Sequence, residues 1–389
     1  MGNLALATIL LGAALLASMV SVELGISVAL IELVLGVVIG NAFHVTTPDW
    51  LVFLAGFAGI LLTFLAGAEV DVEQLKREWR ASTAIGVVSF AGPCVVAMAF
   101  CYWGLDWTAD AAKIGGIALS TTSLAVVYAV LVETGLNRTV IGKRIMAATF
   151  VTDLSTVTTL SILFIKPSWW FVPFVAVSVA LVVGLPRVAP AFFRRFGDRV
   201  IEPEIKLAFA SLLLLMWLGA KANSQAVLPA FVLGLALSSH YASHRSEQER
   251  LRVVAFAFLT PIFFLRGGMS VSVSALWANL GVLALLFLAK LAPKLAGVYP
   301  LARRYCAPHA AFTTLLMSTG LTFGTISSLY GLNAGIVDET QFSLLIAVVV
   351  LSAIVPTVIA QRFFQPDVAE EARRDASELG RPVLEAEGV

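Results

Sequence analysis

Long apolar stretches, separated by short polar ones, follow one another along most of the chain. A membrane-spanning helix needs about 20 mostly apolar residues, and thirteen stretches approach that length. They lie at 3–22, 26–43, 49–68, 80–103, 111–134, 142–165, 168–187, 203–222, 225–240, 250–268, 275–302, 308–330 and 340–364. The pattern predicts an all-α polytopic membrane protein with 13 transmembrane helices.

Basic residues gather in every second loop between these stretches. The loops after the third, fifth, seventh, ninth and eleventh stretches each carry at least two Lys or Arg, whereas the alternate loops hold Lys113, Lys166, Lys221 and Arg266 at most. Because basic residues mark the cytoplasmic side, we expect an outside N-terminus and a cytoplasmic C-terminus. The membrane is expected to be the inner (plasma) membrane of a cell, with residues 365–389 as a short charged cytoplasmic tail.

Three short motifs recur at an offset close to 200 residues. The pairs are VLG at 34–36 and 232–234, FLAGAEVDVEQL at 64–75 and FLRGGMSVSVSAL at 264–276, and LSTTSL at 119–124 and MSTGL at 317–321. Each offset spans seven predicted helices, an odd number, so the second copy must enter the membrane the opposite way up. This predicts an inverted-topology repeat, which is typical of secondary transporters.

Composition agrees with a membrane protein. The chain of 389 residues is 59% hydrophobic and 13% charged, whereas a soluble domain has about 25% charged residues. The net charge of +1 says nothing about nucleic acid, and no nucleic-acid partner is expected. We find no phosphate loop, zinc spacing or nucleophile triad, so neither an enzyme nor a bound cofactor is expected.

Two stretches in corresponding positions of the repeat favour interrupted helices. The fifth segment carries four consecutive hydroxyl residues, Ser120, Thr121, Thr122 and Ser123, and the twelfth carries Ser318, Thr319 and Gly320 within MSTGLTFGTISS. Hydroxyls satisfy the backbone groups that a helix break frees, and glycines let the chain bend. The alternative is that these small residues serve helix packing.

One carboxylate, Asp153, lies at mid-depth in the sixth segment, within ATFVTDLSTVTTLS (148–161). An ionised Asp there costs at least ~2.5–3.5 kcal/mol. Burial disfavours the charged form and a nearby cation favours it, so Asp153 can hold a proton or a Na⁺ ion but hardly both. Thr152, Thr122 and Ser123 would add oxygen ligands. The alternative is a structural Asp that pairs with a buried cation or caps a broken helix.

The eleventh segment carries two lysines within LLFLAKLAPKLAG. Lys290 is mid-membrane and is expected to balance a carboxylate or to cap a broken helix end, although its stem could reach the interface. Lys294, one turn nearer the cytoplasmic end, could extend toward that surface. Among the other charged residues, Glu32 could line a water-filled funnel or be tied to backbone. Arg266, at the outer end of the tenth segment, could be an interface anchor.

These residues resemble a family, the bacterial cation:proton antiporters of the NapA/NhaA type, in the branch that includes the Kef-like potassium transporters. IELVLGVVIGNAF (31–43) is similar to the family's early GE-x-LAG-x-L-x-GP helix. LTPIFFLRGGMSVSVSAL (259–276) is similar to its LAPIFF…VG stretch, and KLAPKLAG (290–297) to its K-x-x-G-x-x-x-G helix. The resemblance covers nearly all of residues 1–364.

The resemblance implies an NhaA-like fold, in which two discontinuous helices cross, and a homodimer that works by elevator-like movement of a core. The dimerisation domain would comprise 1–78 and, with a linker, 167–274; the core would comprise 79–166 and 275–364. Asp153 matches the essential carboxylate, and Lys290 the family lysine. Thr152 stands where electrogenic members carry a first Asp, so the simplest stoichiometry is one proton per cation, although a buried Lys290 could itself release a proton.

Na⁺/H⁺ exchange is therefore the leading hypothesis, and K⁺ or Li⁺ could replace Na⁺. MSTGLTFG lacks the Arg-Gly-Glu common in relatives, which leaves the ion preference open. A K⁺/H⁺ antiporter of the Kef-like type is the nearest alternative. A Na⁺-coupled organic-anion symporter on the same fold is a second, and a non-transporting sensor or channel-like protein a third.

Overall fold

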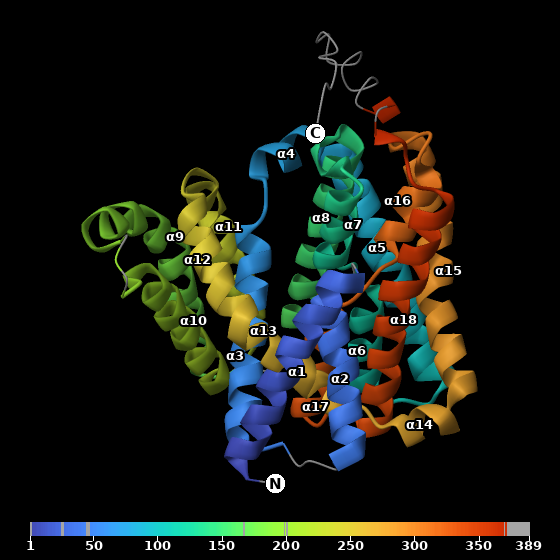
Figure 1. Ribbon diagram of the computed structural model, residues 1–389, viewed down its shortest axis with the longest axis horizontal. Helices are drawn as coiled ribbons and strands as arrows, with labels where there is room; N and C mark the ends of the chain where they lie inside the picture. The colour runs from blue at the N-terminus through green and yellow to red at the C-terminus, as the bar shows by residue number, and fades with distance from the viewer. Residues whose placement is uncertain are drawn as a thin grey trace. The chain divides into compact units, whose positions relative to one another are not determined.

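The structure is a computed structural model, and it describes residues 2–24, 27–43, 47–165, 168–197, 199, 201–368 and 370–371. Across these residues every regular element is a helix. Ten helices, or helices joined end to end, are long and apolar enough to cross a membrane, and two further apolar helices are shorter. The all-helical polytopic fold is confirmed, and its helices can be followed in Figure 1.

Most helices begin and end within a few residues of the predicted segments, but the helix predicted at 168–187 continues to Phe196. In chain order they are α1 (Asn3–Leu24), α2 (Val28–Phe43), α3 (Asp49–Ala68), α4 (Val72–Arg77), α5 (Trp79–Ala99), α6 (Ala109–Ser120), α7 (Leu124–Glu133), α8 (Val140–Leu163), α9 (Phe171–Phe196), α10 (Pro203–Lys221), α11 (Val227–Ser243), α12 (Arg245–Val254), α13 (Thr260–Met269), α14 (Val273–Ala278), α15 (Leu280–Tyr305), α16 (Ala310–Met317), α17 (Thr322–Asn333) and α18 (Glu339–Phe363). A π-helical turn (Phe100–Gly104) extends α5, and another (Ala255–Leu259) joins α12 to α13.

The chain divides into two compact units. The first comprises residues 1–72, 154–283 and 325–346, and the second comprises 73–153, 284–324 and 347–389. The division of the chain into a dimerisation domain and a core stays a prediction. Most of the charged tail lies outside the described residues, and so do His44 and Lys166.

Glycines bring two pairs of helices into close contact within the first unit. Gly36 of α2 lies against Gly268 of α13, and a Cβ at Gly36 would overlap the carbonyl oxygen of Leu265. In the same way Gly234 of α11 lies against α3, and Gly67 of α3 lies against α11. Small residues let backbones approach in this manner. The four glycines belong to the motifs that recur at an offset near 200, and each pair joins one copy to the other.

The second unit is built around α5, α6, α8, α15 and the interrupted helices. Gly86 of α5 lies against the backbone of α8 at Ala148, and Gly116 of α6 lies against α5 at Cys94. An apolar cluster that includes Ile85, Leu316 and Met317 fills the interior between them. These contacts hold the polar residues of the fifth, sixth, eleventh and twelfth predicted segments in one place.

Candidate functional site

Both hydroxyl-rich stretches interrupt a helix. The first helix, α6, ends at Ser120, and α7 begins at Leu124 after three extended or irregular residues. The second, α16, ends at Met317, and α17 begins at Thr322. Thr121 is extended, with φ −63° and ψ 152°. A helix that stops inside the membrane leaves carbonyl groups without partners, so each interruption must be satisfied by other donors.

The hydroxyls of the interrupted stretches supply part of that satisfaction. Four of them donate to carbonyl oxygens three or four residues earlier, at 2.8–3.1 Å: Ser120, Thr121, Ser318 and Thr319. Ser123 instead acts as the N-cap of α7, where its Oγ accepts from the backbone N–H of Val126 at 3.4 Å. Each of these hydroxyls is fully buried.

The two interruptions contact each other. Thr122 Oγ1 donates to the carbonyl oxygen of Met317 at 2.9 Å, and Ser89 Oγ of α5 donates to the same oxygen at 3.3 Å. Gly320 is equally close to the first interruption, because a Cβ there would lie 3.1 Å from the carbonyl oxygen of Thr121 and 2.5 Å from Lys290 Nζ. The absence of a side chain at position 320 therefore allows this approach.

Lys294 joins the two interruptions. Its Nζ donates to the carbonyl oxygen of Thr121 at 2.9 Å, to Thr122 Oγ1 at 2.9 Å and to the carbonyl oxygen of Met317 at 2.8 Å. The hypothesis that Lys294 extends to the cytoplasmic surface is therefore wrong: the residue is fully buried. Its ammonium has three protons, and carbonyl oxygens freed at two helix ends, together with one hydroxyl, give each proton an acceptor.

Lys290 lies one turn earlier on α15 and is also fully buried. It donates to the carbonyl oxygen of Thr121 at 3.2 Å, so that oxygen accepts from both lysines. A cation at the C-terminal end of a helix is favoured by the helix dipole. Lys290 therefore lies at a broken helix end, one of the two positions expected for it.

Asp153 of α8 is 1% exposed, and its Oδ1 has no hydrogen-bond partner within the described part of the chain. Thr149, one turn earlier, lies 3.5 Å from the sulfur of Met317, which places this part of α8 beside the second interruption. Lys294 lies close enough to interact electrostatically with the Asp153 carboxylate. A buried carboxyl oxygen that lacks a donor is costly, and a proton or a metal cation would satisfy it.

Thr152 turns toward backbone. Its Oγ1 donates to the carbonyl oxygens of Ala148 and Gly86, at 3.1 and 3.3 Å.

The structure gathers Asp153, Lys290, Lys294 and both interruptions in one unit. The sequence signal that could have identified Lys294 is its spacing of four residues from Lys290, which puts both on one face of α15.

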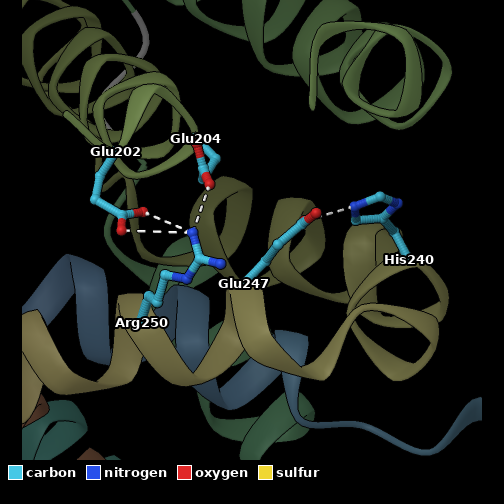
Figure 2. Close-up of polar contacts among 5 residues, drawn as sticks. All are labelled: Glu202, Glu204, His240, Glu247 and Arg250. Carbon is cyan, nitrogen blue, oxygen red and sulfur yellow. Dashed lines mark hydrogen bonds and ion pairs between the residues drawn. The ribbon is translucent and has the colours of Figure 1, made fainter. Parts of the chain in front are cut away.

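A separate polar cluster lies in the first unit (Figure 2). Arg250 of α12 contacts Glu202 at 3.5 Å and Glu204 of α10 at 3.4 Å, while Glu247 contacts His240 Nε2 of α11 at 2.9 Å. The Glu204 side chain is only 4% exposed. These pairs tie the polar end of α12 to two neighbouring helices.

Comparison with known proteins gives one family. The profile of the family described as "Sodium/hydrogen exchanger, transmembrane" matches residues 7–365. The chain is 23% identical over 365 residues to the probable Na(+)/H(+) antiporter 3 of Methanocaldococcus jannaschii, covering 88% of this chain and 91% of that protein. It is 24% identical over 384 residues to the Na(+)/H(+)-K(+) antiporter GerN of Bacillus cereus, covering 92% and 96%.

The fold is similar to that of a solved antiporter. The sodium proton antiporter MjNhaP1 of Methanocaldococcus jannaschii, solved at pH 8, superposes with a TM-score of 0.68 at 15% identity, covering 93% of this chain and 99% of that one. The superfamily suggested by the sequence motifs is confirmed. The structural match is to an NhaP protein, however, and not specifically to the NhaA or Kef type.

Proposed function

The chain belongs to the sodium/hydrogen exchanger family, and we propose that it is an antiporter that exchanges Na⁺ for H⁺ at Asp153. The observation that carries this proposal is the position of the carboxyl group. Asp153 is buried beside two helix interruptions, and its Oδ1 lacks a hydrogen-bond donor among the described residues.

The exchange follows from competition for one carboxylate. When protonated, the carboxyl group is neutral and tolerates burial; when it releases the proton, the remaining charge needs a cation nearby. Na⁺ prefers oxygen ligands, which the Asp153 carboxylate, Thr152, Thr122 and Ser123 would provide. Because the two ions cannot occupy the carboxylate together, loading of one releases the other.

Lys294 stabilises the ionised carboxylate during this competition. Its electrostatic interaction with Asp153 stabilises the carboxylate between the departure of the proton and the arrival of the metal ion. Its hydrogen bonds to both interruptions tie the state of the carboxylate to the geometry of the broken helices. Lys290 donates to the carbonyl oxygen of Thr121 at the same helix end and adds a second positive charge to the site.

The architecture we propose has thirteen spanning segments, in which the joined pairs α6–α7 and α16–α17 each form one. The two reciprocal glycine contacts, α2 with α13 and α3 with α11, support an inverted-topology repeat. We further propose a homodimer in the plasma membrane, with alternating access by movement of the helices that carry the interruptions.

With one carboxylate at the site, exchange of one proton for one Na⁺ would be electroneutral. K⁺/H⁺ exchange is the second candidate, because the name of one relative, GerN, includes K⁺. Proteoliposomes with an internal pH dye and a preset pH gradient separate the cases when Na⁺, K⁺ and Li⁺ are added in turn, with and without a voltage clamp by valinomycin and K⁺. We expect Na⁺ to dissipate the gradient at a rate independent of voltage. A gradient unaffected by all three ions would overturn the proposal.

A further inference from the structure

A cavity of about 350 Å³ lies within the first unit. Asp153 belongs to the second unit and does not line it. It is lined by α3, the start of α11, α13, α17 and the loop before α11. Its walls are mostly apolar, with Ile60, Phe263 and Leu329 among them, but four polar side chains also line it: Gln225, Arg266, Tyr330 and Asn333. Small-molecule sites typically combine an apolar wall with a few converging polar groups.

Arg266 is the unusual member of this lining. It is 5% exposed, and its Nη2 donates to Asn333 Oδ1 at 2.5 Å. Its Nε has no hydrogen-bond partner in the part of the chain that the structure describes. None of the described residues that line the cavity is acidic. The sequence-based hypothesis of an interface anchor is therefore wrong, because an anchor would reach the lipid surface.

A guanidinium is always charged in proteins and donates in a planar fork that matches carboxylate and phosphate oxygens. Burial of such a group without an anion is costly. Asn333 is a neutral acceptor for the Nη2 of Arg266. The positive charge of Arg266 therefore has no negatively charged partner among the residues that line the cavity.

We propose that this cavity binds an oxyanion, a carboxylate or phosphate group carried by a compact apolar body, with Arg266 as the anchor. The anionic oxygens would face the guanidinium and the amides of Asn333 and Gln225, and the apolar part would contact Phe263 and Leu329. The oxyanion could belong to a free small molecule or to the headgroup of an anionic lipid, since both present the same chemistry to the arginine.

The test is a thermal-stability titration of the purified full-length protein in a neutral detergent. Sodium benzoate, inorganic phosphate and phosphatidylglycerol serve as probes, with NaCl at matched ionic strength and phosphatidylcholine as the two control additives. We expect a saturable rise in Tm of a few degrees, as mass action requires for a ligand of the folded state. A response to benzoate or phosphate without added lipid indicates a free anion; a response to phosphatidylglycerol alone indicates a headgroup.

Asn333→Asp is the decisive variant, because a carboxylate 2.5 Å from Nη2 would pair with the guanidinium from within the protein. It should fold at least as stably as the wild type and lose the response to the probes at least tenfold in apparent affinity. Arg266→Gln should lose it as well, while Lys221→Gln, which removes an exposed cation of α10, should keep it. A wild-type Tm that rises no more with the probes than with NaCl or phosphatidylcholine, or an unchanged response in Asn333→Asp, would overturn the proposal.

Discussion

Lys294 Nζ lies 2.8 Å from the carbonyl oxygen of Met317 and 2.9 Å from that of Thr121, so one ammonium group holds the ends of two interrupted helices together. The two acceptors are 196 residues apart in the sequence, from position 121 to position 317. Each oxygen also has at least one other donor, which is Lys290 for Thr121, and Thr122 Oγ1 and Ser89 Oγ for Met317. The same ammonium interacts electrostatically with Asp153, which connects this carboxylate to the helix interruptions.

Replacement of Lys294 by Met should therefore destabilise the protein strongly. Three hydrogen bonds from one ammonium group to buried acceptors are lost, and a bond from a charged donor contributes about 1.5–3 kcal/mol. The loss is partly relieved because Lys290 still donates to Thr121, and Thr122 and Ser89 still donate to Met317. Lys290→Met removes one bond of 3.2 Å and should lower the thermal midpoint less. Lys221→Met is the control at an exposed position. Thermal melting monitored by size-exclusion chromatography ranks the three variants by stability. A larger fall in the thermal midpoint for Lys290→Met than for Lys294→Met would contradict this ranking.

Gly320→Ala should impair the contact between the interruptions. The added Cβ would meet Lys290 Nζ at 2.5 Å, a side chain that can shift, but also the backbone oxygen of Thr121 at 3.1 Å. Overpacking of this kind costs about 1–3 kcal/mol, and we expect at least a severalfold fall in exchange rate in proteoliposomes. Gly184→Ala on α9 meets nothing within 4 Å and should behave like the wild type. Equal activity of the two variants would show that the close approach at Gly320 has no role.

The glycine contacts of the first unit predict similar losses of stability when equivalent glycines of the two repeat copies are replaced. Gly36→Ala and Gly234→Ala occupy equivalent places in the two VLG motifs, and each would push a Cβ into the backbone of the facing helix. Both should lose about 1–3 kcal/mol or more of stability, whereas Gly12→Ala on α1, with open space around it, should lose none. Thermal melts of the three variants test this; tolerance at either VLG glycine would argue against equivalent packing in the two copies.

Arg250→Ala should destabilise the end of α12. The change removes the cation from Glu202 and from the largely buried Glu204. A buried carboxylate that loses its partner costs about 1–3 kcal/mol, and partial exposure of Arg250 keeps the effect in the lower part of that range. Arg187→Ala, at an exposed position of α9, is the matched control. If both variants melt together, the contacts in Figure 2 contribute nothing measurable.

Much of the helix layout could be predicted because apolar length and the placement of Lys and Arg depend on the bilayer and act locally along the sequence. The interruptions at Thr121 and Thr319 were also accessible, since clustered hydroxyls and glycine are what a broken helix requires. The role of Lys294 was not, because its acceptors are backbone oxygens freed on two distant segments. Arg266 shows the same limit: its burial depends on Asn333, 67 residues later.

One proton and one cation compete for Asp153 in the proposed mechanism, and the pH dependence of the apparent KM for Na⁺ measures this competition. In proteoliposomes, we expect KM to rise about tenfold for each unit by which pH falls in the acidic range, by mass action of the competing proton, while the maximal rate stays constant. Asp153→Asn should fold and show no Na⁺-dependent proton flux. A KM independent of pH, or exchange that survives in Asp153→Asn, would rule out competition at Asp153.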